Sequence, residues 1–256
     1  MPPSAVHPTP YPDVNAVLHE LLSNAQAILG GHFVGMYLYG SLASGDFDPD
    51  TSDIDFAVAT AAEVPDELIP VLDEMHLRLA SSGQKWASKL EGSYVSQHVL
   101  RRYEPNQPPC PQINEGRFYL APHGSDWVIQ RHIIREHGVV LAGPAPETLI
   151  DPVQPDDLRR AVKGTLTEWW APMLNDPARL QDSVYQAYAV LTMCRALYTL
   201  EHGTIASKPR SARWAQEALD ERWRELIEQA VAWRPGRRLD KFTETLEFIR
   251  YAKDRG

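Results

Sequence analysis

The amino-acid sequence predicts an α+β protein of two domains, a mixed β-sheet with helices in residues 1–152 and an α-helical bundle in residues 153–256. In the first part of the chain, short apolar or alternating runs lie between glycine and proline residues, a pattern typical of β-strands. From Asp156 onward, every apolar run recurs at helical spacing instead. The prolines of "VVLAGPAPETLIDPVQP" separate the two patterns, so we place the domain boundary there.

The elements of the first domain follow from periodicity and from stop signals. The first helix ends at Gly30-Gly31, and the last begins with Ser125 as its N-cap and stops at Gly138. In chain order we expect a helix at 14–29, strands at 33–39 and 53–59, a helix at 66–79, strands at 88–96 and 117–121, and a helix at 125–137. The proline-rich residues 101–116 predict a long loop between the last two strands.

The second domain should contain about five helices, because glycine or proline interrupts its helical pattern at intervals. These helices are expected at 156–170, 182–202, 209–219, 220–233 and 239–253. Helices with apolar stripes of this kind bury them against one another, so a bundle is the expected architecture.

Composition excludes several classes of protein. The net charge of −9 and the pI of about 5.5 disfavour nucleic-acid binding, which depends on Lys and Arg, and are compatible with a cationic small-molecule partner. No stretch approaches the ~20 apolar residues of a membrane span. Two cysteines offer neither a disulfide framework nor a zinc site, and the proline-rich start lacks the regions of a secretory signal. We therefore expect a cytoplasmic protein. A monomer is also expected, although nothing in the composition or the motifs indicates the oligomeric state.

The acidic stretch "YGSLASGDFDPDTSDIDFAV", residues 39–58, admits several interpretations. Asp46, Asp48 and Asp50 match the first three ligand positions of an EF-hand calcium loop. Thr51 stands where that loop needs glycine, and Ala57 stands where it needs a bidentate glutamate. These three aspartates therefore predict a solvated turn.

Asp53 and Asp55 are different, because side chains two residues apart on a strand point to the same face. Two aligned carboxylates indicate a cation between them, and Mg²⁺ is held by one or two carboxylates together with substrate phosphates. At the end of the preceding strand, Gly40 lets the backbone approach a ligand closely, and Ser41 can donate to phosphate oxygens. Alone, a Gly-Ser pair is more often only a turn.

The combination of a strand-end Gly-Ser, a spacer and Asp-x-Asp resembles the nucleotidyltransferase superfamily, with its polymerase-β-like sheet. Glu91 in "SKLEGSYVS" matches the third carboxylate of that superfamily. In addition, "REHGVVLAGPAPETLIDPV", "GTLTEWW", "AVLTMCRALYTLEHGTIASK" and "LEFIRYAKDRG" resemble the aminoglycoside 3''/9-adenylyltransferases, which inactivate streptomycin and spectinomycin. This resemblance implies Mg²⁺-dependent transfer of AMP from ATP to an antibiotic hydroxyl.

The resemblance also implies roles for individual residues. Asp53 and Asp55 would hold Mg²⁺, and Glu91 would share in the metal site and act as the catalytic base. Nucleotide contacts would come from Gly40, Ser41, Arg195 and Lys208. Helical spacing independently places Arg195 on an apolar stripe of its helix. A buried arginine needs an anion, which could be a structural carboxylate as well as a phosphate.

For the cationic drug, the resemblance implies packing on Trp169. Three acids nearby in the sequence could bind the ammonium or guanidinium groups of the drug, namely Glu168, Asp176 and Asp182. A tryptophan at the end of a helix is more often part of the core. The sequence also departs from the family, because the tryptophan of the family's central loop has no counterpart before Arg117 and the acid after Trp169 is displaced to Asp176.

Two other functions stay open on the sequence. A nucleotidyltransferase of this architecture could act on another acceptor, such as a protein hydroxyl or a metabolite, since fold alone does not decide the substrate. A catalytically silent nucleotide-binding module is disfavoured by the intact Asp53, Asp55 and Glu91. An RNA-modifying, polymerase-like enzyme is disfavoured by the acidic charge.

Overall fold

The computed structural model describes residues 7–114 and 116–256, so residues 1–6 of the proline-rich start lie outside the described residues. The chain divides into two compact units. One holds the described residues up to Phe47 together with Ser52–His123 and Gln130–Pro152, and the other holds Asp48–Thr51, Gly124–Ile129 and Val153–Gly256. No helix among the described residues has both the length and the hydrophobicity of a membrane span.

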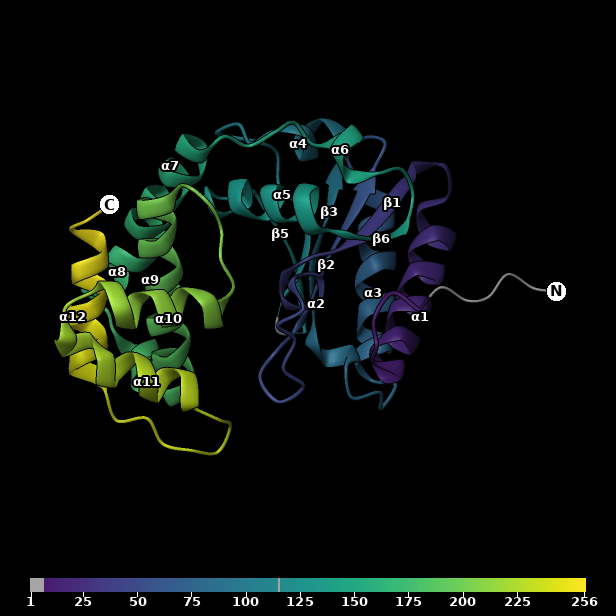
Figure 1. Cartoon of the computed structure of the whole chain (residues 1–256). Helices are drawn as coiled ribbons and strands as arrows, with labels where there is room; N and C mark the ends of the chain where they lie inside the picture. Colours follow the sequence, from purple (N-terminus) through teal and green to yellow (C-terminus); the bar gives the residue numbers. More distant parts are fainter. Residues whose placement is uncertain (1–6, 115) are drawn as a thin grey trace. The chain divides into compact units, whose positions relative to one another are not determined.

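The first unit is built on a mixed six-stranded sheet (Figure 1), in the order β5-β4-β3-β2-β1-β6. Its strands are β1 Phe33–Leu38, β2 Ile54–Thr60, β3 Leu90–Ser96, β4 Cys110–Asn114, β5 Arg117–Ala121 and β6 Val139–Ala142. Strands β2 and β3 are parallel, and the other neighbouring pairs are antiparallel. The parallel pair requires a crossover connection, which residues 61–89 provide.

The helices of this unit are α1 Pro12–Leu29, α2 Gly40–Ser44, α3 Ile69–Ala80, α4 Gln97–Arg101 and α6 Pro146–Leu149. Helix α5 Asp126–His137 begins in the other unit and belongs to this one from Gln130 onward. Helices α1 and α3 lie side by side against one face of the sheet (Figure 1). The core there includes Leu18 and Leu21 of α1, Leu72 of α3, and Ile54 and Phe56 of β2, all fully buried. Because side chains alternate along a strand, the residues between these core positions of β2 point to the opposite face.

Two strands were not expected from the sequence. Strand β4 lies within residues 101–116, which were expected to be a loop. Strand β6 lies at the start of the proline-rich segment that was expected to link the two domains. Pro111 argues against a strand at this position of the sequence, since proline is normally excluded from strand interiors. Its carbonyl nevertheless accepts a hydrogen bond from Ser93 Oγ, at 3.3 Å. The edge strand β6 has only four residues and is stabilised by its pairing with β1, a contact distant in sequence.

The second unit is an α-helical bundle, as expected from the sequence. Its helices are α7 Pro155–Thr165, α8 Ala171–Met173, α9 Ser183–His202, α10 Lys208–Ala218, α11 Arg224–Ala232 and α12 Phe242–Lys253, with a π-helical turn at Leu166–Trp170. Helix α9 contacts α7, α10, α11 and α12, so it is the central element. Val190 and Met193 of α9 pack in a core with Trp170, Ile227 and Phe248.

A buried histidine makes the stability of the first unit depend on pH. His76 of α3 is 2% exposed, and its Nε2 lies 2.9 Å from the hydroxyl of Tyr94 on β3. Burial lowers the pKa of His76 from 6.5 to about 4. The unfolded chain therefore binds a proton between these values that the folded chain does not. Stabilisation by neutral His76 is complete above pH 6.5 and is lost as the pH falls to about 4.

We expect His76→Gln to flatten this dependence, because glutamine can still bond the Tyr94 hydroxyl but does not titrate. The free energy of unfolding of the parent should fall relative to the variant by roughly 3 kcal/mol between pH 6.5 and pH 4. Urea unfolding at a series of pH values measures the difference. Parallel pH profiles for the two proteins would contradict the assignment.

Candidate active site

The topology of the sheet brings three separate segments to one end of its central strands. Because β1 and β2 are antiparallel, with Leu38 opposite Phe56, the end of β1 lies beside the start of β2. Because β2 and β3 are parallel, the start of β3 lies there too, and Asp55 is the direct Cα partner of Glu91. Both side chains lie on the face opposite to α1 and α3. Gly40 follows β1 at the same end, so three of the predicted site residues meet.

Gly40 is in close contact with the carboxylate of Asp55. A Cβ atom added to Gly40 would lie 1.9 Å from Oδ2 of Asp55, far inside van der Waals contact. Gly40 also has a φ of +64°, a conformation that side-chain-bearing residues rarely adopt. The Tyr39 N–H donates a hydrogen bond to the carbonyl of Asp55, at 3.1 Å. Glycine is therefore required at this position on two grounds, backbone conformation and the space that the carboxylate occupies.

Asp53 precedes the strand rather than belonging to it, since β2 begins at Ile54. Its carboxylate forms an ion pair with Lys89, at 3.3 Å between Oδ1 and Nζ. Sequence reasoning missed Lys89. The signal was available, because a parallel pairing that sets Ile54 beside Leu90 also sets the residues just before them side by side. Asp53 and Lys89 are both partly exposed, so the pair is accessible to ligands.

The donor set suits a hard cation that completes its coordination with other oxygens. Asp53, Asp55 and Glu91 offer only carboxylate oxygens, the ligand type that Mg²⁺ prefers. Within residues 7–114 and 116–256, no three His, Cys, Asp or Glu side chains converge as a complete metal site. A cation bound at this end of the sheet would thus need oxygens from water or from a phosphate-bearing ligand as well.

The other aspartates of the acidic stretch form a turn, as expected. The N–H of Asp50 donates to Oδ1 of Asp48, at 3.0 Å, and the N–H of Thr51 donates to the carbonyl of Asp48, at 3.1 Å. Asp46 and Asp50 are exposed. Asparagine and aspartate commonly stabilise turns through such hydrogen bonds. Ser41 lies between this turn and β1, in the short helix α2 that begins at Gly40.

Of the two predicted phosphate-binding cations, Lys208 lies near an aromatic ring of α9, the helix that carries Arg195. Lys208, the exposed first residue of α10, has its Nζ 5.9 Å from the centroid of the Tyr188 ring. Tyr188 lies seven residues before Arg195, two turns away on α9, so the two side chains share a face of that helix. Arg195 is half-buried, but Val184 and Tyr188 at the start of the expected apolar stripe are 54% and 43% exposed. The stripe is thus buried only toward its end.

The predicted drug-binding residues occupy different environments. Trp169 is 47% exposed, whereas the neighbouring Trp170 is 1% exposed and belongs to the core. Glu168 accepts a hydrogen bond from Ser125 Oγ, at 3.0 Å. Asp182 is the N-cap of α9, and its Oδ1 accepts from the Val184 N–H, at 2.8 Å. Asp176 is exposed. Of the two tryptophans, only Trp169 is available to a ligand.

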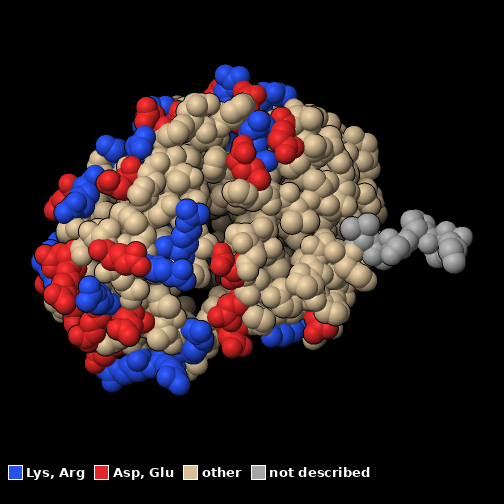
Figure 2. Space-filling view, viewed as in Figure 1, with Lys and Arg blue, Asp and Glu red and all other residues tan. Residues whose placement is uncertain are grey.

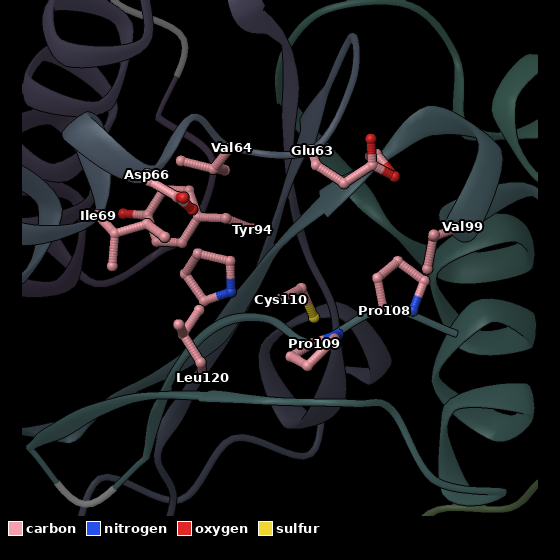
Figure 3. A pocket seen from close by; sticks show the side chains of 12 residues that line it. Glu63, Val64, Asp66, Ile69, Tyr94, Val99, Pro108, Pro109, Cys110 and Leu120 are labelled. Carbon is pink, nitrogen blue, oxygen red and sulfur yellow. The ribbon is translucent and has the colours of Figure 1, made fainter. Parts of the chain in front are cut away.

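The first unit also contains a separate pocket of about 290 Å³ near the opposite end of β3 (Figure 3). It is lined by Ser96, the last residue of β3, and by Cys110, Pro108 and Leu120. Ser96 lies five positions beyond Glu91 along the strand, a distance of roughly 16 Å. The carboxylates at the start of the strands do not line this pocket, so it is distinct from the candidate active site.

Charged side chains of both signs lie on the face of the helical unit that Figure 2 shows. Lys and Arg lie beside Asp and Glu over much of it, and a group of Lys and Arg side chains lies together along its lower edge.

Comparison with known proteins matches a family model to each part of the chain. Residues 25–117 match the nucleotidyltransferase domain, and residues 148–255 match the C-terminal domain of aminoglycoside adenylyltransferases. The resemblance seen in the sequence motifs is thereby confirmed, as is the combination of a nucleotidyltransferase sheet with a helical domain.

Relatives span nearly the whole chain. An aminoglycoside (3'') (9) adenylyltransferase of Shigella flexneri is 28% identical over 254 residues, covering 94% of each protein. A spectinomycin 9-adenylyltransferase of Campylobacter jejuni is 25% identical over 240 residues, covering 90% of this chain and 88% of that protein. The structure of spectinomycin adenyltransferase AAD(9) from Enterococcus faecialis, with ATP and spectinomycin, is similar with a TM-score of 0.71 at 20% identity. It covers 94% of this chain and 98% of that one, and shows that the fold is shared.

The contact between Gly40 and Asp55 predicts a difference between two glycine substitutions. Gly45 also has a positive φ, +77°, but nothing lies within 4 Å of an added Cβ. Gly45→Ala should therefore cost only the backbone strain, about 1–2 kcal/mol, whereas Gly40→Ala should cost about 1–3 kcal/mol more because it displaces the carboxylate. Urea unfolding followed by circular dichroism measures both. Equal destabilisation would show that Asp55 does not depend on the space at Gly40.

Proposed function

We propose that this chain is an aminoglycoside nucleotidyltransferase that transfers AMP from ATP to a hydroxyl of an aminoglycoside or aminocyclitol antibiotic of the streptomycin or spectinomycin type. The observation that carries the proposal is the register that sets Glu91 beside Asp55, next to Gly40. Adenylyltransferases that span nearly the whole chain support the same reaction class. The ATP and spectinomycin named for the related structure support the donor and the type of acceptor.

The reaction requires an acceptor oxygen, a leaving group and a proton acceptor. The drug hydroxyl oxygen bonds to the α-phosphorus of ATP, the bond from that phosphorus to the β-phosphate oxygen breaks, and pyrophosphate leaves. The proton of the hydroxyl passes to the carboxylate of Glu91, which acts as the general base. Asp53, Asp55 and Glu91 would hold Mg²⁺, which when bound supplies neutralisation of the phosphate charges. Gly40 allows the phosphates to approach the backbone, and Ser41 donates a hydrogen bond to them.

The helical unit supplies cations for the phosphates and acids for the drug. Arg195 and Lys208 bind phosphate oxygens. In support, Lys208 lies near the ring of Tyr188, which is on the same face of α9 as Arg195. Trp169 packs against the drug, which its exposure permits.

Three acids around Trp169 bind the cationic groups of the drug, namely Glu168, Asp176 and Asp182. Asp182 already caps α9 through Oδ1, so its contribution to drug binding uses the other carboxylate oxygen.

The proposed setting is the cytoplasm, where ATP is available, with a monomer as the working form and no nucleic-acid partner. The free thiols Cys110 and Cys194 are compatible with a reducing compartment. The net charge of −9 favours a cationic acceptor over a polyanion.

The decisive experiment tests donor and acceptor together. The purified chain is incubated with Mg²⁺, each nucleoside triphosphate in turn and a panel of aminoglycosides and aminocyclitols, and the products are weighed by mass spectrometry. We expect a mass gain of one adenylyl group on streptomycin or spectinomycin, with ATP as the donor. A parallel incubation uses a cell extract and labelled ATP. If the label were transferred only to a protein or to a metabolite, the antibiotic would not be the substrate and the alternative acceptor would be supported.

The roles of the two paired carboxylates can be separated by isosteric substitutions. Asp55→Asn should abolish transfer, because it removes a charge from the metal site. Glu91→Gln should lower the rate ~10²–10⁴-fold, the usual contribution of a general base, while ATP still binds. Asp46→Asn, at an exposed turn position, serves as the control and should match the parent.

Steady-state kinetics and calorimetric titration with Mg-ATP provide the two measurements. Loss of ATP binding in Glu91→Gln would make Glu91 chiefly a metal ligand. Parental turnover by Asp55→Asn would remove the metal assignment.

A further inference from the structure

An arginine of the helical unit lies on the aromatic surface assigned to the drug. Arg179 belongs to the short 3₁₀ turn Ala178–Gln181, which connects α8 to α9. The carbon at the centre of its guanidinium lies 5.6 Å from the centroid of the Trp169 ring and 5.9 Å from that of the Tyr185 ring. Both distances are within the ~6 Å reach of a cation–π interaction.

The rings around Arg179 form one continuous cluster. The centroid of Tyr185 lies 6.3 Å from that of Trp170 and 5.5 Å from that of Tyr188. The core therefore fixes Tyr185 in place, whereas Trp169 is 47% exposed and projects from the π-helical turn. Single π-helical turns occur frequently at functional sites. Arg179 thus covers a ligand-accessible ring at the edge of a rigid aromatic cluster.

The cation–π contacts of the Arg179 guanidinium are with these two rings, and no Asp or Glu among the described residues forms an ion pair with it. Its positive charge is therefore not neutralised by an adjacent carboxylate. A second cation brought to the same ring faces would have to displace Arg179 and would be repelled by it.

We propose that Arg179 is a specificity-determining residue, which disfavours acceptors whose own guanidinium would lie on Trp169 and Tyr185. The inference rests on the proposed function. Planar guanidinium groups stack on aromatic faces, whereas compact ammonium groups are strongly hydrated point charges that pair with carboxylates. Streptomycin carries guanidinium groups and competes directly with Arg179. Spectinomycin carries only methylammonium groups, which the neighbouring acids can bind, so the chain prefers spectinomycin.

Arg222 provides a matched comparison within the same unit. Its guanidinium lies over Trp223, at 4.3 Å, and near Tyr251, at 5.8 Å. Trp223 is only 2% exposed and packs in the core. Arg222 therefore lies over a ring that is buried in the core, and its substitution controls for the general loss of a cation–π contact.

The test compares kcat/KM for streptomycin and for spectinomycin in the full chain with Mg-ATP. Arg179→Gln should raise the streptomycin-to-spectinomycin ratio by about two- to thirtyfold, the range that corresponds to cation–π energies from exposed to desolvated sites. Arg179→Lys keeps the charge and should raise the ratio less. Arg222→Gln should leave it at the parental value. An unchanged ratio in Arg179→Gln, or an equal change in Arg222→Gln, overturns the proposal.

A measurement without turnover separates this inference from the proposed function. Streptomycin is titrated calorimetrically into the parent and into Arg179→Gln, with Mg²⁺ and a non-cleavable α,β-methylene analogue of ATP. We expect tighter binding to Arg179→Gln, and we expect this gain to disappear in the Trp169→Leu background. Equal streptomycin affinities, including no binding to either protein, overturn the role of Arg179. Tighter binding to Arg179→Gln without AMP transfer to any drug would instead reject the proposed reaction and retain the binding role.

Discussion

The candidate active site depends on one steric constraint, the absence of a side chain at Gly40. The Asp55 carboxylate occupies the space that a Cβ of residue 40 would need, and the backbone there has a left-handed conformation. Strand pairing then fixes the remaining geometry, since Asp55 is held opposite Glu91 by the register of β2 and β3. A strand-end glycine, an aspartate and a glutamate on two parallel strands thus form one unit, and none of the three is placed independently of the others.

Much of this unit could be predicted from the sequence, because its determinants are local. The strand at 117–121 was predicted with the bounds observed, and alternation identified Asp55 as the residue opposite to the buried Ile54 and Phe56. The pairing of Asp55 with Glu91 could be expected only from the family resemblance, since periodicity carries no information on register between strands. Strand β4 was missed for a related reason, because its stability comes from neighbours on both sides that override the local effect of Pro111.

The helical unit shows where sequence patterns are least informative. Spacing identified the helices but not which stripe faces solvent, so Tyr188 was expected on a buried face and is 43% exposed. Two adjacent tryptophans, Trp169 and Trp170, have opposite environments because successive side chains on a helix point about 100° apart, so that one faces the core and the other faces solvent. Arg179 lies in a 3₁₀ turn of only four residues, too short for a periodic pattern, and its position over the rings follows only from tertiary packing.

The ion pair between Lys89 and Asp53 has a consequence for how the acidic end of the sheet tolerates its own charge. Neighbouring carboxylates repel one another, and Lys89 offsets part of that repulsion in the folded chain before any ligand binds. Exposed ion pairs of this kind contribute only about 0–1 kcal/mol, so Lys89 can be released at little cost. A cation that binds at Asp53 then replaces Lys89 as the counter-ion of this carboxylate. The chain can therefore fold before that cation binds.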